Sequence, residues 1–351
     1  MKKPIILILA SLISLSTLAD DKLYQVTTFD PHFISQFENN ITTVRKDGRL
    51  WLVNIIKPLP YLLRGFFRPA DLNKVDSYQP MVLKTKNENP FQSMVDEASK
   101  ENIKFSVEKL SSYKTRYAGS SENQQATLWI ENKFKELGYE TKQICYKAGA
   151  CSVLAEKKPE IVNNDVILVV AHFDSVGKLF AGADDNGSGT ASLLEMARVL
   201  SNKKLKKTLR FLATNGEEIN LLGAANYSSL LQSEGTIKKL KLVINMDMVG
   251  YNSNGIVELE TNKEYETLAN WFAQLAADYT TLKSKITLGA WGSDHVPFLE
   301  KGISTILTIE DWSTKTPCYH KECDKPDTVN YAYAREITKL NLAAVLTKDF
   351  E

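Results

Sequence analysis

The sequence predicts an α/β fold, a three-layer α/β/α sandwich with a mostly parallel mixed central sheet, plus a small N-terminal α+β extension. Val166 to Val170 is a run of five aliphatic residues. A run without polar alternation is typical of a strand buried on both faces of a sheet. Further apolar runs alternate with helical patterns, as in sheets covered by helices on both sides. A polar, glycine-rich segment follows the run directly, so we expect chemistry at the carboxyl end of this strand.

The remaining elements are expected in the following order. Before the central strand lie helices at Phe91–Leu110 and Glu122–Leu137 and strands at Tyr139–Tyr146 and Ser152–Glu156. The second helix is amphipathic, with Leu128, Ile130, Phe134 and Leu137 expected on one side. After the central strand we expect helices at Ser188–Leu200, Leu222–Gln232, Tyr265–Tyr279 and Tyr331–Phe350, and strands at Thr208–Ala213, Leu240–Met246, Ile256–Glu260 and Ser304–Ile309.

The charge balance excludes some partners. The chain has 43 Lys and Arg residues against 42 Asp and Glu residues. Because neither sign is in excess, the composition gives no indication of nucleic acid or of an anionic membrane surface as a partner.

The first residues have the pattern of an export signal. Lys2 and Lys3 precede an apolar core at Ile5–Leu18, and the residues up to Ala19 suit cleavage before Asp20. The core is shorter than the ~20 residues that a membrane-spanning helix needs. We therefore expect residues 1–19 to be a removed signal peptide, with secretion or a periplasmic location and no membrane anchor.

Residues 20–89 form a separate N-terminal extension. They contain strand signals at Lys22–Thr28, helix signals at Pro31–Glu38 and a hairpin pattern at Ile41–Ile56, with Asp47-Gly48 as the turn. Two interpretations are open for this extension: a propeptide that restrains the site until it is removed, or a permanent structural part. Residues 90–351 are expected to be the main domain.

Polar residues follow several of the expected strands. His172 and Asp174 end the central strand, Glu217 and Glu218 follow the next one, and Asp247 ends a third. His320 lies in a short loop near the C-terminus. Imidazole and carboxylate groups are ligands for divalent cations. A single His-x-Asp is common as a turn, but four such segments meeting at one sheet edge indicate a metal site.

The four cysteines fit an oxidising compartment. They form two close pairs, Cys145 with Cys151 and Cys318 with Cys323, and we favour local pairing among the three possible connectivities. The second pair would enclose His320 in a small ring. Zinc ligation by cysteine is the disfavoured alternative, because the histidines and carboxylates supply enough ligands.

Six motifs give the chain a resemblance to a known family. HxD, GADDNGSG, GEE, MDMVGY, SDHxPF and CYHxxCD occur here in the order seen in the co-catalytic zinc aminopeptidases of peptidase family M28. The cysteine-bounded loop resembles the secreted bacterial, Streptomyces-type branch that includes leucyl aminopeptidases. The resemblance covers the chain from about Pro90 to the C-terminus.

The resemblance implies two zinc ions per chain, with Asp185 as the bridging ligand. One zinc would take His172 and Asp247, and the other Glu218 and His320. Two zinc ions carry a charge of +4, which three carboxylates and one bridging hydroxide bring close to neutral. That hydroxide would attack the peptide bond, with Glu217 as general base and then acid.

The remaining residues surround this set. Asp174 is expected to orient His172 by accepting a hydrogen bond from its second ring nitrogen. The resemblance places Ser293, Asp294 and His295 at the substrate pocket, with Trp291 and Phe298 flanking them. Core packing is an equal alternative for the two aromatic residues, and a hydrogen-bonded structural role is favoured for His295.

These observations favour an exported metallo-aminopeptidase acting on peptides with an apolar N-terminal residue such as leucine, and we expect a monomer. One alternative is a glutaminyl-peptide cyclase with a single zinc, which shares HxD, GEE and DHxPF. The other is a non-catalytic binding ectodomain on the same fold. The GADDNGSG and CYHxxCD motifs favour the peptidase, and all five ligand positions are filled.

Overall fold

The computed structural model describes residues 23–27, 41–47, 50–55, 68–69, 80–81, 89–160, 163–177, 180–251 and 254–351. The chain divides into two compact units, one up to Leu72 and the other from Asn73 onward. Each is considered by itself.

The first unit contains a small antiparallel sheet. Its strands are β1 (Leu23–Thr27), β2 (Ile41–Asp47), β3 (Leu50–Ile55) and β4 (Arg68–Pro69), in the order β2-β3-β1-β4. This confirms the expected strand and hairpin. The signal segment, the helix at Pro31–Glu38 and most of the linker lie outside the described residues. The expected boundaries at residues 19 and 89, and the possible removal of residues 20–89, stay predictions.

The second unit is built on a mixed sheet in the order β5-β12-β11-β13-β10-β8-β9-β7-β6. Its strands are β5 (Pro80–Met81), β6 (Glu140–Lys147), β7 (Ala150–Lys157), β8 (Val166–His172), β9 (Thr208–Thr214), β10 (Leu240–Met246), β11 (Ile256–Thr261), β12 (Lys283–Leu288) and β13 (Thr305–Glu310). The four central strands β13, β10, β8 and β9 are parallel to one another. Antiparallel pairs lie toward both edges.

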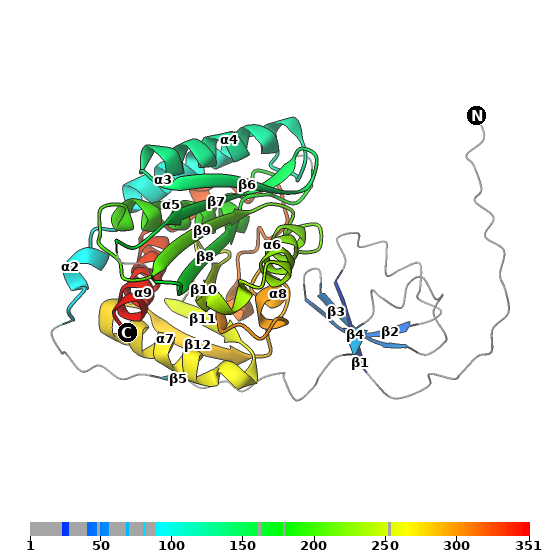
Figure 1. Ribbon diagram of the computed structural model, residues 1–351. Helices are drawn as coiled ribbons and strands as arrows, with labels where there is room; N and C mark the ends of the chain where they lie inside the picture. The colour runs from blue at the N-terminus through cyan, green and yellow to red at the C-terminus, as the bar shows by residue number, and fades with distance from the viewer. Residues whose placement is uncertain are drawn as a thin grey trace. The chain divides into compact units, whose positions relative to one another are not determined.

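Helices cover both faces of this sheet, which confirms the expected three layers (Figure 1). The helices are α2 (Gln92–Val95), α3 (Lys100–Ser111), α4 (Ser121–Glu136), α5 (Gly189–Leu200), α6 (Leu222–Ser233), α7 (Glu266–Tyr279), α8 (Val296–Leu299) and α9 (Tyr331–Phe350). Alternate residues of β8 enter two separate cores. One core includes residues of α4, α5, α7 and α9, and the other includes residues of α6 and α8. The central strand is therefore buried on both faces, as its sequence predicts.

The structure corrects three expectations. The helix expected at Phe91–Leu110 is two helices, because the side chain of Ser99 accepts a hydrogen bond from the main-chain N–H of Asn102 and starts α3 afresh. Leu128 is exposed, because it lies two residues, about 200° around the helix, from the buried Ile130. Strand β12 was not expected, although its buried positions alternate along the strand.

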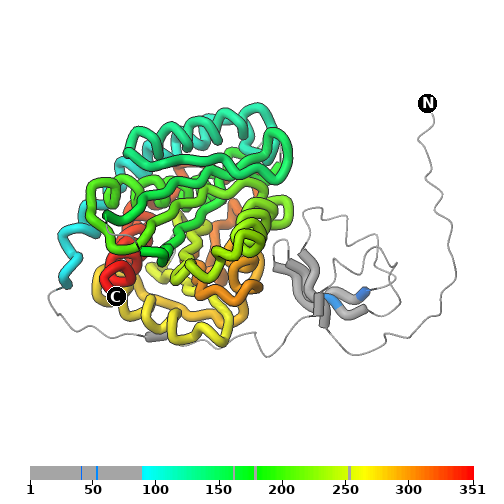
Figure 2. The backbone as a smooth tube through the Cα atoms, in the orientation of Figure 1, coloured from blue at the N-terminus to red at the C-terminus, as the bar shows by residue number. Residues whose placement is uncertain are grey.

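Figure 2 follows the backbone of the second unit to its end in α9, which packs beside α5 and α7. Among the described residues, no helix has both the length and the apolar character needed to cross a membrane.

Candidate metal centre

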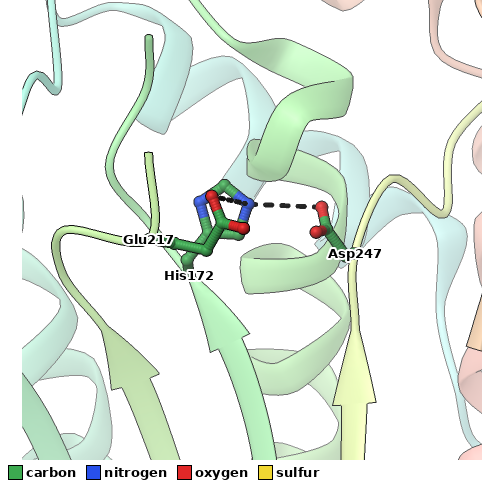
Figure 3. A group of neighbouring side chains, drawn as sticks. All are labelled: His172, Glu217 and Asp247. Atoms are coloured by element: carbon green, nitrogen blue, oxygen red, sulfur yellow. Dashed lines mark hydrogen bonds and ion pairs between the residues drawn. The ribbon is translucent and has the colours of Figure 1, made fainter. Parts of the chain in front are cut away.

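Three parallel strands bring the expected site residues to one edge of the sheet. His172 ends β8, Asp247 follows β10 directly, and Glu217 lies just beyond the end of β9. Strand β8 pairs with both of the others. Figure 3 shows the carboxylates of Glu217 and Asp247 close to the ring of His172. This is the edge at which parallel sheets place their functional residues.

These three side chains are close enough to share an ion. Nε2 of His172 lies 3.2 Å from Oδ1 of Asp247 and 3.8 Å from Oε2 of Glu217. All three side chains are buried, and their ligand atoms lie within 4.8 Å of one another. The geometry therefore places Glu217 within reach of an ion shared with His172 and Asp247.

Asp185 faces both histidines. Its Oδ1 lies 3.4 Å from Nε2 of His172, and its Oδ2 lies 3.0 Å from Nε2 of His320. Nε2 of His320 is also 3.3 Å from Oε2 of Glu218. His172, Asp185 and Glu218 make up a second group that could hold an ion. The two oxygens of Asp185 thus approach different histidines, while His172 is common to both groups.

Two buried polar atoms beside Asp185 test whether the residues fit a metal. Oδ2 of Asp185 and Nε2 of His320 lie 3.0 Å apart, but neither makes a hydrogen bond of normal geometry within the described part of the chain. Buried polar atoms are normally paired. Imidazole nitrogen and carboxylate oxygen are also donors that zinc takes. The residues present therefore fit a zinc centre.

The carboxylates control the protonation of the two histidines in the metal-free protein. Burial would lower the pKa of His172, but the negative charges of Glu217 and Asp247 outweigh it and raise that pKa well above its usual value. At His320 burial is likewise opposed by Glu218 and Asp185, which raise the pKa to about 10. Both histidines are therefore protonated at neutral pH, and a bound metal must displace these protons.

Asp174 contacts residues at the ends of both β8 and β9. Nδ1 of His172 lies 3.2 Å from the main-chain oxygen of Asp174 and 3.6 Å from its carboxylate Oδ1. The carboxylate accepts the main-chain N–H groups of Glu217, at 3.1 Å, and Glu218, at 3.2 Å. Asp174 thus approaches His172 mainly through its main chain, and its side chain fixes the turn that carries the two glutamates.

Asn186 holds the turn of Asp185 against the end of β10. Its Nδ2 donates to the main-chain oxygen of Met246 at 2.9 Å, and its Oδ1 accepts the N–H groups of Gly189, at 2.9 Å, and Met248, at 3.1 Å. Asn186 is not among the site residues predicted from the sequence. Its place directly after Asp185 in the glycine-rich motif was the available signal.

The residues expected at the substrate pocket are mostly buried. Oγ of Ser293 donates to Oδ2 of Asp247 at 2.6 Å and accepts from Nδ2 of Asn245 at 2.8 Å. The buried carboxylate of Asp294 accepts a hydrogen bond from the hydroxyl of Thr214. Ser293 therefore supports a proposed ligand, while contact of Ser293 or Asp294 with substrate stays a prediction.

The other three expected pocket residues differ in burial. Nε2 of the buried His295 is 3.0 Å from Oε1 of Glu260, in line with the hydrogen-bonded role favoured from the sequence. Phe298 is fully buried and packs edge-on against Tyr227, with 6.5 Å between ring centroids. Trp291 is half-buried. Core packing therefore accounts for Phe298, and Trp291 retains accessible surface.

A row of aromatic rings leads to His320. The ring centroids of Trp291 and Trp312 are 5.5 Å apart, and those of Trp312 and Tyr319 are 5.3 Å apart, both edge-to-face. Tyr319 stacks on His320 at 3.8 Å. Trp291, Trp312 and Tyr319 are all half-buried, and Tyr319 is the member of the row that contacts the proposed ligand.

Both local disulfides form, which confirms the favoured pairing. Cys145 and Cys151 face each other across β6 and β7. Cys318 and Cys323 close the loop that contains His320. His320 has a φ of 55°, a left-handed conformation that non-glycine residues rarely adopt. The small ring limits the conformations of this loop.

Comparisons with known proteins place the chain in a family. The model of peptidase family M28 matches residues 152–345, more than half of the chain. Aminopeptidase YwaD of Bacillus subtilis (strain 168) is 34% identical over 201 residues, which cover 55% of this chain and 44% of that protein. Leucine aminopeptidase 1 of Ajellomyces capsulatus (strain NAm1 / WU24) is 25% identical over 278 residues, 70% of each chain. The match to YwaD thus spans less than half of that relative.

Solved structures share the fold. LapB from Legionella pneumophila superposes with a TM-score of 0.71 at 22% identity, covering 94% of this chain and all of that one (100%). BSAP, a zinc aminopeptidase from Bacillus subtilis, gives a TM-score of 0.64 at 20% identity, covering 75% and 96%. The family match, together with the shared fold, shows that this chain belongs to peptidase family M28.

Proposed function

We propose that the protein is an exported zinc aminopeptidase that removes N-terminal residues, preferably apolar ones such as leucine, from peptides. The observation that carries this proposal is the position of Asp185, with one carboxylate oxygen toward His172 and the other toward His320. Such a carboxylate can bridge two ions, and pairs of ions about 3.5–4 Å apart are a recurrent arrangement in aminopeptidases.

In this proposal one zinc is held by His172 and Asp247, and the other by Glu218 and His320, with Asp185 shared. Bound zinc would polarise the scissile carbonyl and acidify the attacking water. The buried hydrogen bond from Ser293 to Asp247 keeps one of the ligands oriented.

Glu217 is proposed to move the proton. Its carboxylate accepts a proton from the attacking water and then delivers it to the leaving amine nitrogen, so that the peptide bond is cleaved with no net change in Glu217. Asp174 fixes the main chain of Glu217 and of the neighbouring ligand Glu218 with one carboxylate. A single rigid turn can therefore present one glutamate to zinc and the other to water.

The aromatic row supports the preference for an apolar residue. Trp291, Trp312 and Tyr319 form a continuous row of rings, of which Tyr319 contacts His320 and Trp312 also carries the ammonium of Lys315 at 4.1 Å. Two glutamates of β11 fix the loops that carry the tryptophans, since Glu260 accepts the N–H of Trp291 at 2.8 Å and Glu258 that of Trp312 at 2.9 Å. An aliphatic side chain of the substrate would lose its hydration against this wall.

Export is proposed from the signal-like pattern of residues 1–19 and from the two disulfides, which persist in oxidising compartments. A monomeric state stays a prediction.

The test is hydrolysis of a panel of aminoacyl p-nitroanilides by the purified protein, with zinc content measured on the same sample. We expect release of p-nitroaniline from the leucyl substrate, loss of release after chelation, and none from N-acetyl-leucyl p-nitroanilide. Incubation with a peptide that begins with glutamine distinguishes the aminopeptidase from a glutaminyl-peptide cyclase. Loss of ammonia without a free amino acid would contradict the aminopeptidase proposal.

A further inference from the structure

Asp324 links the loop of His320 to the turn of Asp185. It is buried and directly follows Cys323, which closes that loop. Its Oδ1 accepts the main-chain N–H of Asp184 at 2.8 Å, and its Oδ2 accepts that of Asp185 at 3.0 Å. One carboxylate therefore binds two consecutive amides that lie 139 and 140 residues away in the chain.

Arg116 holds the same turn from its other side. Its guanidinium is fully buried and donates to the main-chain oxygens of Ala181 and, at 2.7 Å, Gly182. It also donates to the oxygen of Phe173, at 2.6 Å, next to the proposed ligand His172. Burial lowers the pKa of this guanidinium to about 10, and Asp324 is the carboxyl group that opposes this shift most. The carbonyl groups before Asp184 and the amide groups of Asp184 and Asp185 are thus held by two buried side chains, the guanidinium of Arg116 and the carboxyl group of Asp324.

A second carboxyl group at this site also accepts two consecutive main-chain N–H groups. Asp174 uses its two oxygens on the consecutive amides of Glu217 and Glu218. The two turns that carry Asp185 and Glu218 are therefore fixed by the same kind of contact, although they follow different strands.

We propose that Asp324 is a positioning residue for the bridging carboxylate, which sets the position of Asp185 relative to His320. This inference rests on the proposed function, in which Asp185 and His320 share a zinc. The N–H of Asp324 also donates to the main-chain oxygen of Lys321 at 3.1 Å, beside His320. A shift of the disulfide loop would reach the bridging carboxylate through this residue.

The test replaces Asp324 with asparagine in the full-length protein. An amide keeps the size of the side chain but accepts through one oxygen only, so one of the two main-chain N–H groups loses its partner. Asp327→Asn is the matched control, because Asp327 carries the same change three residues away and is exposed. Zinc affinity is measured by competition with a chelator, and the melting temperature of the metal-free protein is measured in parallel.

We expect Asp324→Asn to bind zinc about 10–100-fold more weakly, the range seen when a group behind a metal ligand is removed. Asp327→Asn should bind zinc like the unmodified protein. A purely structural role would lower the melting temperature and leave zinc affinity unchanged, and that result would overturn the proposal.

A second variant covers the case in which Asp324→Asn does not fold. Asp324→Glu keeps the carboxyl group but is longer by one methylene, so it cannot keep both amide bonds without a shift. It should fold and still bind zinc more weakly, and unchanged affinity would overturn the proposal. If the unmodified protein itself bound fewer than two zinc ions, the two-metal proposal would fail first, and this inference with it.

Discussion

Replacing Glu217 with glutamine should leave two zinc ions bound and abolish nearly all turnover. The side chain is buried, and its Oε2 lies 3.8 Å from Nε2 of His172. Glutamine has nearly the same volume and keeps the main-chain N–H that Asp174 accepts. The variant thus removes the proton acceptor and little else.

The expected loss follows from that single change. A positioned general acid–base group contributes about 10²–10⁴-fold to the rate, which corresponds to about 3–5 kcal/mol of activation free energy. We therefore expect kcat for leucyl p-nitroanilide to fall by that factor, with KM changed much less. Zinc content is measured on the same preparation.

Glu218→Gln is the matched control, because Glu218 is the neighbouring residue and its amide is held by the same carboxylate. It should lose zinc affinity as well as turnover, since its carboxylate lies 3.3 Å from His320. The opposite pattern, loss of a zinc ion in Glu217→Gln, would make Glu217 a ligand together with His172 and Asp247. Near-normal turnover in Glu217→Gln would refute its role in proton transfer.

Three further predictions concern pH, specificity and the disulfide loop. The pKa of His320 in the metal-free protein is about 10, so zinc affinity should rise with pH by about tenfold per unit for each displaced proton below that value, as titration calorimetry at several pH values would show. The same raised pKa stabilises the metal-free fold fully below about 6.5, and this stabilisation should disappear as pH rises toward 10. Trp312→Ala should lower kcat/KM for leucyl relative to alanyl substrates by roughly 10-fold or more, as expected for lost apolar contact in a pocket, and an unchanged ratio would remove Trp312 from the pocket. Replacing Cys318 and Cys323 with serine should cost about 2 kcal/mol of stability, from the entropy of a small closed loop, and weaken zinc binding, whereas the same change at Cys145 and Cys151 should leave zinc affinity unchanged.

The strand ends could be predicted from the sequence because their signal is local. An aliphatic run that stops at His172 identifies both a buried strand and the point where its chemistry begins. The same reasoning applies to Glu217 and Asp247, and the parallel order of β10, β8 and β9 brings all three together. The expected role of Asp185 came from the family motifs, because the spacing of Asp185 from the other site residues gives no reason to assign it a role.

The supporting contacts could not be predicted, because they join residues distant in sequence. Asp324 and Asp185 lie on different loops, and the residues that flank each one in the sequence do not indicate the other as its partner. Arg116 lies in an ordinary loop, where a charged residue would be expected in solvent, yet it is fully buried. The wrong expectation for Leu128 has a local cause instead, since the angle between Leu128 and Ile130 around the helix follows from their spacing in the sequence.

The most direct test of the two-metal account is a crystal structure of the zinc-loaded protein with anomalous scattering measured at the zinc edge. The account predicts two peaks about 3.5–4 Å apart, one next to His172 and Asp247 and the other next to Glu218 and His320, with Asp185 contacting both. A single peak between His172, Glu217 and Asp247, with Asp185 contacting no metal, would contradict it.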